Sequence, residues 1–141
     1  MVIQRKQSLF LLIAAILMGI YAFMPSLIDA NGNVILGGVC LHGVSAIPFI
    51  LNCLVAVLAF VTIFKFKSLG FQRALCAVSI LLIIASMATM CGIAFLQKEC
   101  DLLGSLTYLN VLPVLAIIFL LLAHKGISHD KKLLSDSGRI R

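Results

Sequence analysis

Four long stretches of this chain contain no Asp, Glu, Lys or Arg: residues 7–28, 30–64, 74–97 and 102–124. They hold 22, 35, 24 and 23 residues, and a helix that crosses a membrane needs about 20 mainly apolar residues. Each stretch therefore has room for one membrane span. The composition agrees, because 62% of the 141 residues are hydrophobic and 11% are charged, whereas about a quarter of the residues in a soluble domain are charged. These values exclude a soluble enzyme core, a disordered chain and a nucleic-acid-binding module.

We predict an all-α integral membrane protein with a single membrane domain over residues 1–141. The expected spans are residues 9–24, 45–65, 74–96 and 105–123, followed by a basic tail over 124–141. The spans should be helical, because lipid offers the backbone no hydrogen-bond partner. The expected arrangement is an antiparallel four-helix transmembrane bundle. The tail should continue the fourth helix or restart as a short amphipathic helix on the membrane surface. Pro113 should kink the fourth helix, because proline lacks a backbone donor.

Lysine and arginine are concentrated on one side of the predicted spans. That side holds ten basic residues, and the other side holds only Lys98. Basic residues favour the cytoplasmic side of a membrane, so both termini are predicted to be cytoplasmic. Tyr21 and Tyr108 fall near the outer helix ends, where aromatic belts form. The first span also has features of a signal peptide, with a cleavage site ending at Ala30; we interpret it as a retained anchor.

The first outer loop has the pattern of a small β-hairpin. Asn31 and Gly32 form a tight-turn signal, because both residues tolerate positive φ. Short apolar runs at 27–28 and 34–36 flank this turn. We therefore predict a hairpin on the outer membrane surface.

No ionisable residue lies inside a predicted span, which disfavours proton-driven transport. Asn52, Thr89 and Asn110 are among the polar residues within the spans. Counted from the outer helix ends, all three lie roughly 10–12 Å deep at 1.5 Å per residue. They form a candidate polar layer between spans two, three and four. The alternative is that they only hydrogen-bond one helix to another.

Two of the five cysteines, Cys40 and Cys100, fall in predicted outer loops. An oxidising exterior permits a disulfide between them, and the alternative is two free thiols. Neither cysteine belongs to a Cys-x-x-Cys pair, so redox catalysis is disfavoured. The sequence contains no recognisable nucleophile–base pair, metal-ligand cluster or phosphate-binding glycine loop. We expect no enzymatic activity and no cofactor.

Both ends of the chain resemble a known family. Residues 3–16 read IQRKQSLFLLIAAI, which is similar to the opening of the bacterial family catalogued as domain of unknown function 4293. The close is also similar, at Leu122, Ala123, Ile127, Asp130, Leu133 and the final Arg139-Ile140-Arg141. The chain departs from the family pattern at Gly126, Ser128, His129, Lys131 and Gly138. The resemblance implies a four-span inner-membrane protein of a Gram-negative cell, and it implies no activity.

The sequence favours a non-enzymatic membrane protein that acts by contact, as an accessory or scaffold subunit or as a small homo-oligomer. The candidate interaction face at the cytoplasmic side comprises Gln4, Arg5, Arg139 and Arg141. The alternative for these four residues is that they only set the topology. Two other functions stay open: binding or passage of a small neutral molecule at the polar layer, and an outward-facing thiol protein using Cys40 and Cys100. The expected partners are the lipid bilayer and a protein or second copy, without nucleic acid.

Overall fold

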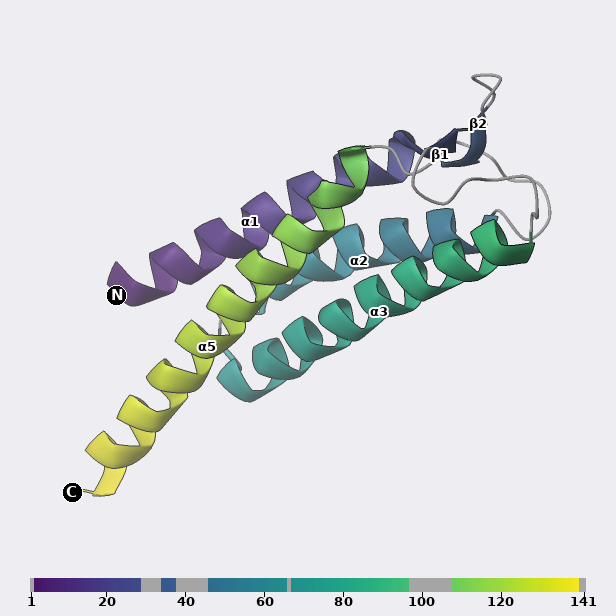
Figure 1. The fold of residues 1–141 in the computed structure, drawn as a ribbon. Helices are drawn as coiled ribbons and strands as arrows, with labels where there is room; N and C mark the ends of the chain where they lie inside the picture. The colour runs from purple at the N-terminus through teal and green to yellow at the C-terminus, as the bar shows by residue number, and fades with distance from the viewer. Residues whose placement is uncertain (1, 29–33, 38–45, 66, 97–107, 140–141) are drawn as a thin grey trace.

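The computed structural model describes residues 2–28, 34–37, 46–65, 67–96 and 108–139. Most of this part of the chain consists of long helices (Figure 1): α1 (Val2–Phe23), α2 (Ala46–Phe64), α3 (Leu69–Leu96) and α5 (Val111–Arg139). The strands β1 (Pro25–Ile28) and β2 (Val34–Gly37) follow α1, and the 3-10 helix η2 (Tyr108–Asn110) precedes α5. The protein is therefore helical apart from one short two-stranded sheet in its described part.

Three helices extend past the predicted spans into charged segments, whereas α2 ends at Phe64, directly before Lys65. Helix α1 begins at Val2, α3 begins at Leu69, and α5 continues unbroken to Arg139. Charged residues are excluded from lipid, but Lys, Arg and Gln are good helix formers, so a charge ends a span without ending its helix. Of the two arrangements predicted for the tail, the structure therefore has the first: the fourth helix continues into it.

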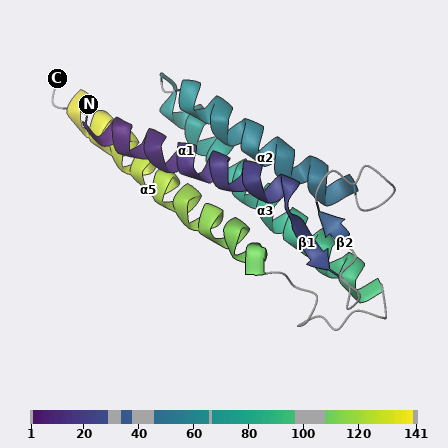
Figure 2. The same cartoon turned by 90° about the horizontal axis from the view of Figure 1, so that it is seen from above.

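Each long helix packs against two others around a shared interior. Helix α1 contacts α2 and α5, and α3 contacts the same two helices. At one end, Phe23 of α1 faces Phe49 of α2, with ring centroids 6.0 Å apart. At the other end, Gln7 of α1 contacts Asp130 in the second half of α5. The direction of α1 is therefore opposite to that of both neighbours, and the beginning of α1 and the end of α5 share one end of the molecule (Figures 1 and 2).

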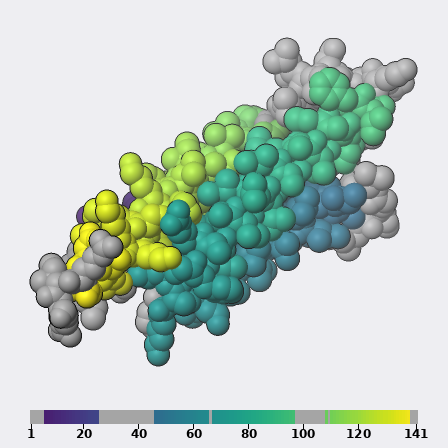
Figure 3. Space-filling view, turned by 90° about the horizontal axis from the view of Figure 1, so that it is seen from below, coloured from purple at the N-terminus to yellow at the C-terminus, as the bar shows by residue number. Residues whose placement is uncertain are grey.

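The outer surface of the helices is apolar, unlike that of a soluble protein, and the interior is mainly apolar as well. Large apolar side chains are on the outside: Phe64, Leu81 and Phe95 are 66%, 65% and 69% exposed. Figure 3 shows α3 uncovered along one face of the molecule, between α5 and α2. Polar side chains are buried at six positions: Gln7, Asn52, Thr62, Gln72, Ser79 and Ser86. The four helices are long and apolar enough to cross a membrane, which suggests a multi-pass membrane protein.

The two strands lie at the position where the sequence predicted a hairpin. They pair in antiparallel register, with Ile28 opposite Val34 and Pro25 opposite Gly37. Residues 29–33, which include the predicted turn, lie outside the described residues. The strands therefore fold the chain back on itself directly after α1.

Pro113 does not occupy the mid-helix position that would produce the predicted kink. Helix α5 begins at Val111, so Pro113 lies in the first turn, where the backbone donor that proline lacks is not needed. Pro48 has the equivalent place in the first turn of α2. In place of a kink, the backbone changes from the 3-10 helix η2 to the α-helix α5 directly before Pro113.

Candidate functional site

The beginning of α1 is joined to α5 by a buried glutamine. Gln7 is 4% exposed, and its Nε2 donates a hydrogen bond to Asp130 Oδ2 at 2.6 Å. The same side chain lies across Gly126, where an added Cβ would be 3.1 Å from Gln7 Cγ and Nε2. This combination of a hydrogen bond and a close approach ties the two helices that carry the chain ends.

The candidate interaction face lies around this contact. Gln4 and Arg5 are in the first turns of α1, and Arg139 is the last residue of α5; Arg141 lies outside the described residues. The fold therefore brings three of the four backbone positions to the same end of the molecule. At 1.5 Å per residue, Arg139 lies about 13 Å beyond Asp130 along α5, whereas Val2, the first residue of α1, lies about 8 Å beyond Gln7. About one turn of α5 therefore extends past the beginning of α1.

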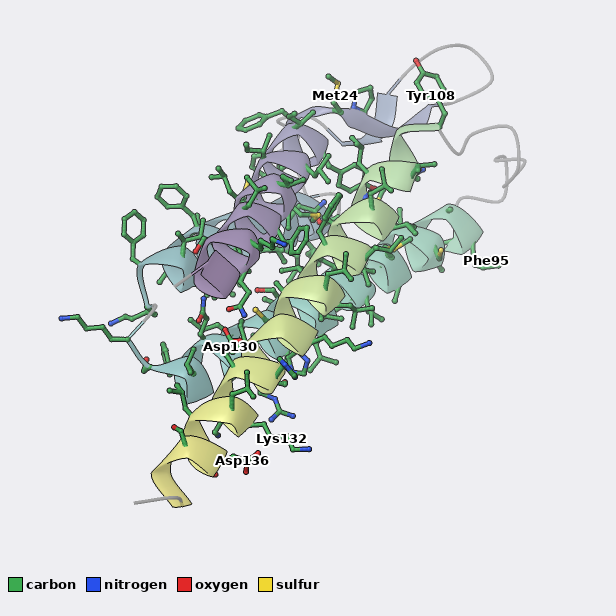
Figure 4. All side chains as sticks on the ribbon, turned by 90° about the vertical axis from the view of Figure 1, so that its left-hand side faces the viewer. Met24, Phe95, Tyr108, Asp130, Lys132 and Asp136 are labelled. Carbon is green, nitrogen blue, oxygen red and sulfur yellow. The ribbon has the colours of Figure 1, made fainter. Side chains whose placement is uncertain are left out.

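The last two turns of α5, residues 131–138, form an exposed terminal segment. Every residue from 131 to 138 is exposed, including Leu133 at 49% and Leu134 at 61%. Figure 4 shows Lys132 and Asp136 on this terminal segment, beyond Asp130. The segment carries apolar and charged side chains that nothing in the described part of the chain covers. It can make contacts with another molecule.

A second polar contact at this end joins α3 to α5. Arg73 Nε donates a hydrogen bond to His124 Nε2 at 3.2 Å. The two residues are 51 positions apart, so no local pattern could have paired them.

At the opposite end of the molecule, Tyr21 is buried and is not an exposed aromatic-belt residue as predicted. Its side chain is 1% exposed, and its hydroxyl donates to Asn110 Oδ1 at 2.7 Å, with Met90 Sδ 3.2 Å away. The single hydroxyl hydrogen favours the amide oxygen, which is a stronger acceptor than a thioether. Tyr108, in contrast, is 85% exposed and projects away from the helices (Figure 4). Tyr21 therefore links helices inside the protein.

The three residues of the candidate polar layer have different surroundings. Asn110 bonds to Tyr21, and the Thr89 hydroxyl donates to the Ser86 carbonyl of its own helix at 2.8 Å. Asn52 is 3% exposed, and its Oδ1 has no hydrogen-bond partner among the described residues. No hydrogen bond between described residues joins these three side chains to one another. A buried polar atom without a partner is costly, so Asn52 is the member of the layer with unused bonding capacity.

The remaining buried hydroxyl groups bond within their own helices. Thr62 donates to the Leu58 carbonyl, Ser79 to the Leu75 carbonyl, and Ser86 to the Ile83 carbonyl. These bonds satisfy the hydroxyl groups without connecting helices. Within the described residues, the side-chain hydrogen bonds that bridge long helices have Gln7, Tyr21 and Arg73 as donors. Of their acceptors, the sequence indicated only Asn110 as a candidate for such a bond.

A hollow on the surface lies between α1 and α2. It has a volume of about 330 Å³ and is lined by Leu12, Ala15, Ile16, Ala56, Val57 and Phe60. All six side chains are apolar. None of the three residues of the candidate polar layer lines this hollow.

Cys40 and Cys100, the predicted disulfide pair, lie outside the described residues. The described cysteines, Cys53, Cys76 and Cys91, are free thiols. In the described part of the chain, His, Cys, Asp and Glu do not gather in a group of three or more that could hold a metal ion. The described region therefore contains no ligand cluster for metal chemistry.

Comparison with known proteins identifies the family but no activity. No curated protein and no solved structure matches the chain. One family model matches residues 3–140, which is nearly the whole sequence, and its description is "Domain of unknown function (DUF4293)". The chain therefore belongs to the family of domain of unknown function 4293.

Proposed function

We propose that this protein is an antiparallel four-helix transmembrane bundle of the bacterial inner membrane, with both termini in the cytoplasm. The exposed apolar side chains of all four long helices support insertion in a bilayer. The excess of Lys and Arg at the predicted cytoplasmic side supports the orientation. In this orientation the β1–β2 pair lies at the outer surface.

The protein acts by contact, as a non-enzymatic accessory or scaffold subunit. The observation that carries this proposal is the terminal segment of α5, which presents exposed Leu133 and Leu134 among charged residues. An exposed helix with neighbouring apolar and charged side chains is a common form of protein-recognition element. The proposed interaction face also includes Gln4, Arg5 and Arg139, whose backbone positions lie at the same end of the molecule.

Affinity purification of the full chain from native membranes in a mild detergent, followed by mass spectrometry, tests this role. The wild-type chain should carry a stoichiometric partner or a second copy. The double variant Leu133→Glu/Leu134→Glu should lose it, because two charges replace the apolar contact. Ser135→Glu is the matched control, since it adds a carboxylate to the same exposed turn without removing a leucine. Recovery of the wild-type chain alone in repeated purifications contradicts the accessory role.

The buried amide of Asn52 supports a second candidate function, which is the binding or passage of a small neutral molecule at the polar layer. Its buried Oδ1 has no partner among the described residues and is therefore available to a ligand donor such as a hydroxyl or amide. Uptake of small polyols into vesicles containing the purified chain tests this function. Asn52→Leu should abolish uptake if Asn52 contacts the molecule, and equal uptake by protein-free vesicles contradicts the proposal.

A further inference from the structure

The hollow between α1 and α2 exists because small side chains meet at this helix pair. Ala15 and Ala56 lie between the larger side chains of Leu12, Ile16 and Phe60. Ala15 is only 9% exposed, whereas Ile16 and Phe60 are 53% and 51% exposed. The alanines therefore form the floor of the hollow, and the larger residues form its raised borders. Its volume of about 330 Å³ is at the lower end of the range for small-molecule sites.

Both helices that line the hollow lead to basic residues at the same end of the molecule. Helix α1 runs opposite to α2, as the contact between Phe23 and Phe49 shows. Following α1 back from the hollow leads to Lys6, and following α2 forward leads to Lys65 and then Lys67, all three of which are exposed. Helices α1, α2 and α3 contain no Asp or Glu. Asp130 of α5 bonds to Gln7, the residue after Lys6, whereas Lys65 and Lys67 have no carboxylate on α1, α2 or α3.

The distance between the hollow and the lysines matches the dimensions of a lipid. Leu12 and Ile16 lie about 9–15 Å from the level of Lys6 along α1, at 1.5 Å per residue. Ala56 and Phe60 lie about 8–14 Å from the level of Lys65 along α2 on the same basis. One leaflet of the hydrocarbon core is about 15 Å deep. A lipid with its headgroup at the lysines thus has its acyl chain at the level of the hollow.

We propose that the hollow holds an acyl chain of an anionic phospholipid whose phosphate is bound by Lys6, Lys65 and Lys67. The inference rests on the proposed insertion in the membrane and adds a ligand class to it. The apolar lining favours the hydrocarbon chain, and three exposed ammonium groups favour a negatively charged headgroup over a zwitterionic one.

Native mass spectrometry of the purified full chain, released from nanodiscs, tests the proposal. The nanodiscs contain equal parts of phosphatidylcholine and phosphatidylglycerol. We expect the wild-type chain to retain phosphatidylglycerol preferentially. Ala56→Phe should lose the retained lipid, because the ring fills the hollow. Ala85→Phe is the matched control, since Ala85 is an exposed alanine on α3 outside the hollow. Circular dichroism verifies that both variants are helical.

The headgroup contact is tested separately with exposed residues whose replacement leaves the helices intact. Each of Lys65→Gln and Lys67→Gln should weaken retention of phosphatidylglycerol about fivefold, the effect of one basic residue near an anionic membrane surface. Equal retention of both lipids overturns the proposal, as does retention unchanged by Ala56→Phe. If Ala56→Phe instead dissociates a dimer, the hollow is a contact between copies and the lipid proposal is wrong.

Alkaline carbonate extraction of native membranes separates this inference from the proposed function. If carbonate releases the chain, the protein is not integral, and both proposals fail. If the chain stays in the membrane fraction but retains no phosphatidylglycerol in preference to phosphatidylcholine, only the lipid site fails.

Discussion

The side-chain amide of Gln7 donates a 2.6 Å hydrogen bond to Asp130, which joins the first helix to the last across 123 residues of sequence. The glutamine is 4% exposed and packs against Gly126 one turn earlier on α5. A hydrogen bond to a carboxylate is stronger than one between neutral groups. This contact therefore sets how the beginning of α1 and the second half of α5 lie against each other.

Replacing Gln7 should destabilise the bundle in a graded way. Gln7→Leu removes the donor and should lower the free energy of unfolding by about 1–2 kcal/mol. Gln7→Glu should cost more, because it places two carboxylates at hydrogen-bond distance. Adding Asp130→Asn to Gln7→Glu should recover part of the loss, since the new amide can donate to the new carboxylate. Thermal unfolding in detergent measures the stability of all three variants. If the effects of Gln7→Glu and Asp130→Asn simply add in the double variant, the two side chains are not in contact.

A methyl group at Gly126 should conflict with Gln7. Alanine normally favours a helix over glycine by about 1 kcal/mol, but here the added Cβ would lie 3.1 Å from a side chain held by its hydrogen bond. We expect Gly126→Ala to lower the unfolding midpoint of the wild-type chain. In a Gln7→Ala background, where the Gln7 side chain is gone, the same substitution should raise the midpoint. Gly19→Ala and Gly92→Ala are the controls, because nothing lies within 4 Å of either added Cβ. Both controls should stabilise the protein.

Removing the Tyr21 hydroxyl should affect stability, whereas removing that of Tyr108 should not. Tyr21→Phe eliminates the 2.7 Å hydrogen bond to Asn110 inside the protein and should cost about 1 kcal/mol. Tyr108 is 85% exposed, so Tyr108→Phe should change the free energy of unfolding by less than about 0.5 kcal/mol. Equal effects of the two substitutions would show that Tyr21 does not make the buried contact.

The buried amide of Asn52 should make the ligand-free protein less stable than a variant with an apolar side chain at this position. Asn52→Leu replaces a buried amide, whose Oδ1 has no partner among the described residues, with an apolar group of similar size. It should raise the free energy of unfolding by about 1 kcal/mol. Asn52→Ala also removes the polar atom but leaves a void, which opposes the gain. A Leu variant less stable than wild type would indicate that the amide is satisfied.

The predicted disulfide between Cys40 and Cys100 has a direct chemical test. Mass spectrometry of the unreduced protein should find the two cysteines in one linked peptide. Cys40→Ser and Cys100→Ser should each remove the same bridge and have the same effect, about 4 kcal/mol for a loop of some sixty residues. Labelling of both thiols by maleimide before reduction is the outcome that contradicts the bridge. It would also remove the basis for a thiol function.

Local sequence patterns predicted the elements of this fold well. The charge-free stretches predicted four apolar helices at the places where α1, α2, α3 and α5 occur. The turn signal at Asn31 and Gly32 predicted the chain reversal that β1 and β2 form on either side of it. Each of these features depends on residues that are neighbours in the sequence. Their positions could therefore be predicted without knowledge of the tertiary structure, apart from the helix ends in charged segments and the beginning of α5.

The candidate site was predicted less completely, because it depends on which face of each helix points inward. The spans are apolar on all sides, so their sequence does not distinguish an inner from an outer face. Tyr21 illustrates this: its place near a helix end predicted an interfacial residue, yet its side chain is buried against Asn110 and Met90. The predicted polar layer was likewise chosen by depth alone. Depth did not show that Thr89 bonds to its own helix.

The sequence by itself determined the number of helices, their apolar character and the membership of the family. It determined them because exclusion of charge from a span is a property of each segment alone. Only the tertiary structure decided that Gln7 reaches Asp130, that Arg73 reaches His124, and that Ala15 and Ala56 leave a hollow between two helices. These contacts depend on the rotation of each helix about its axis. That rotation is set by packing between residues far apart in the chain.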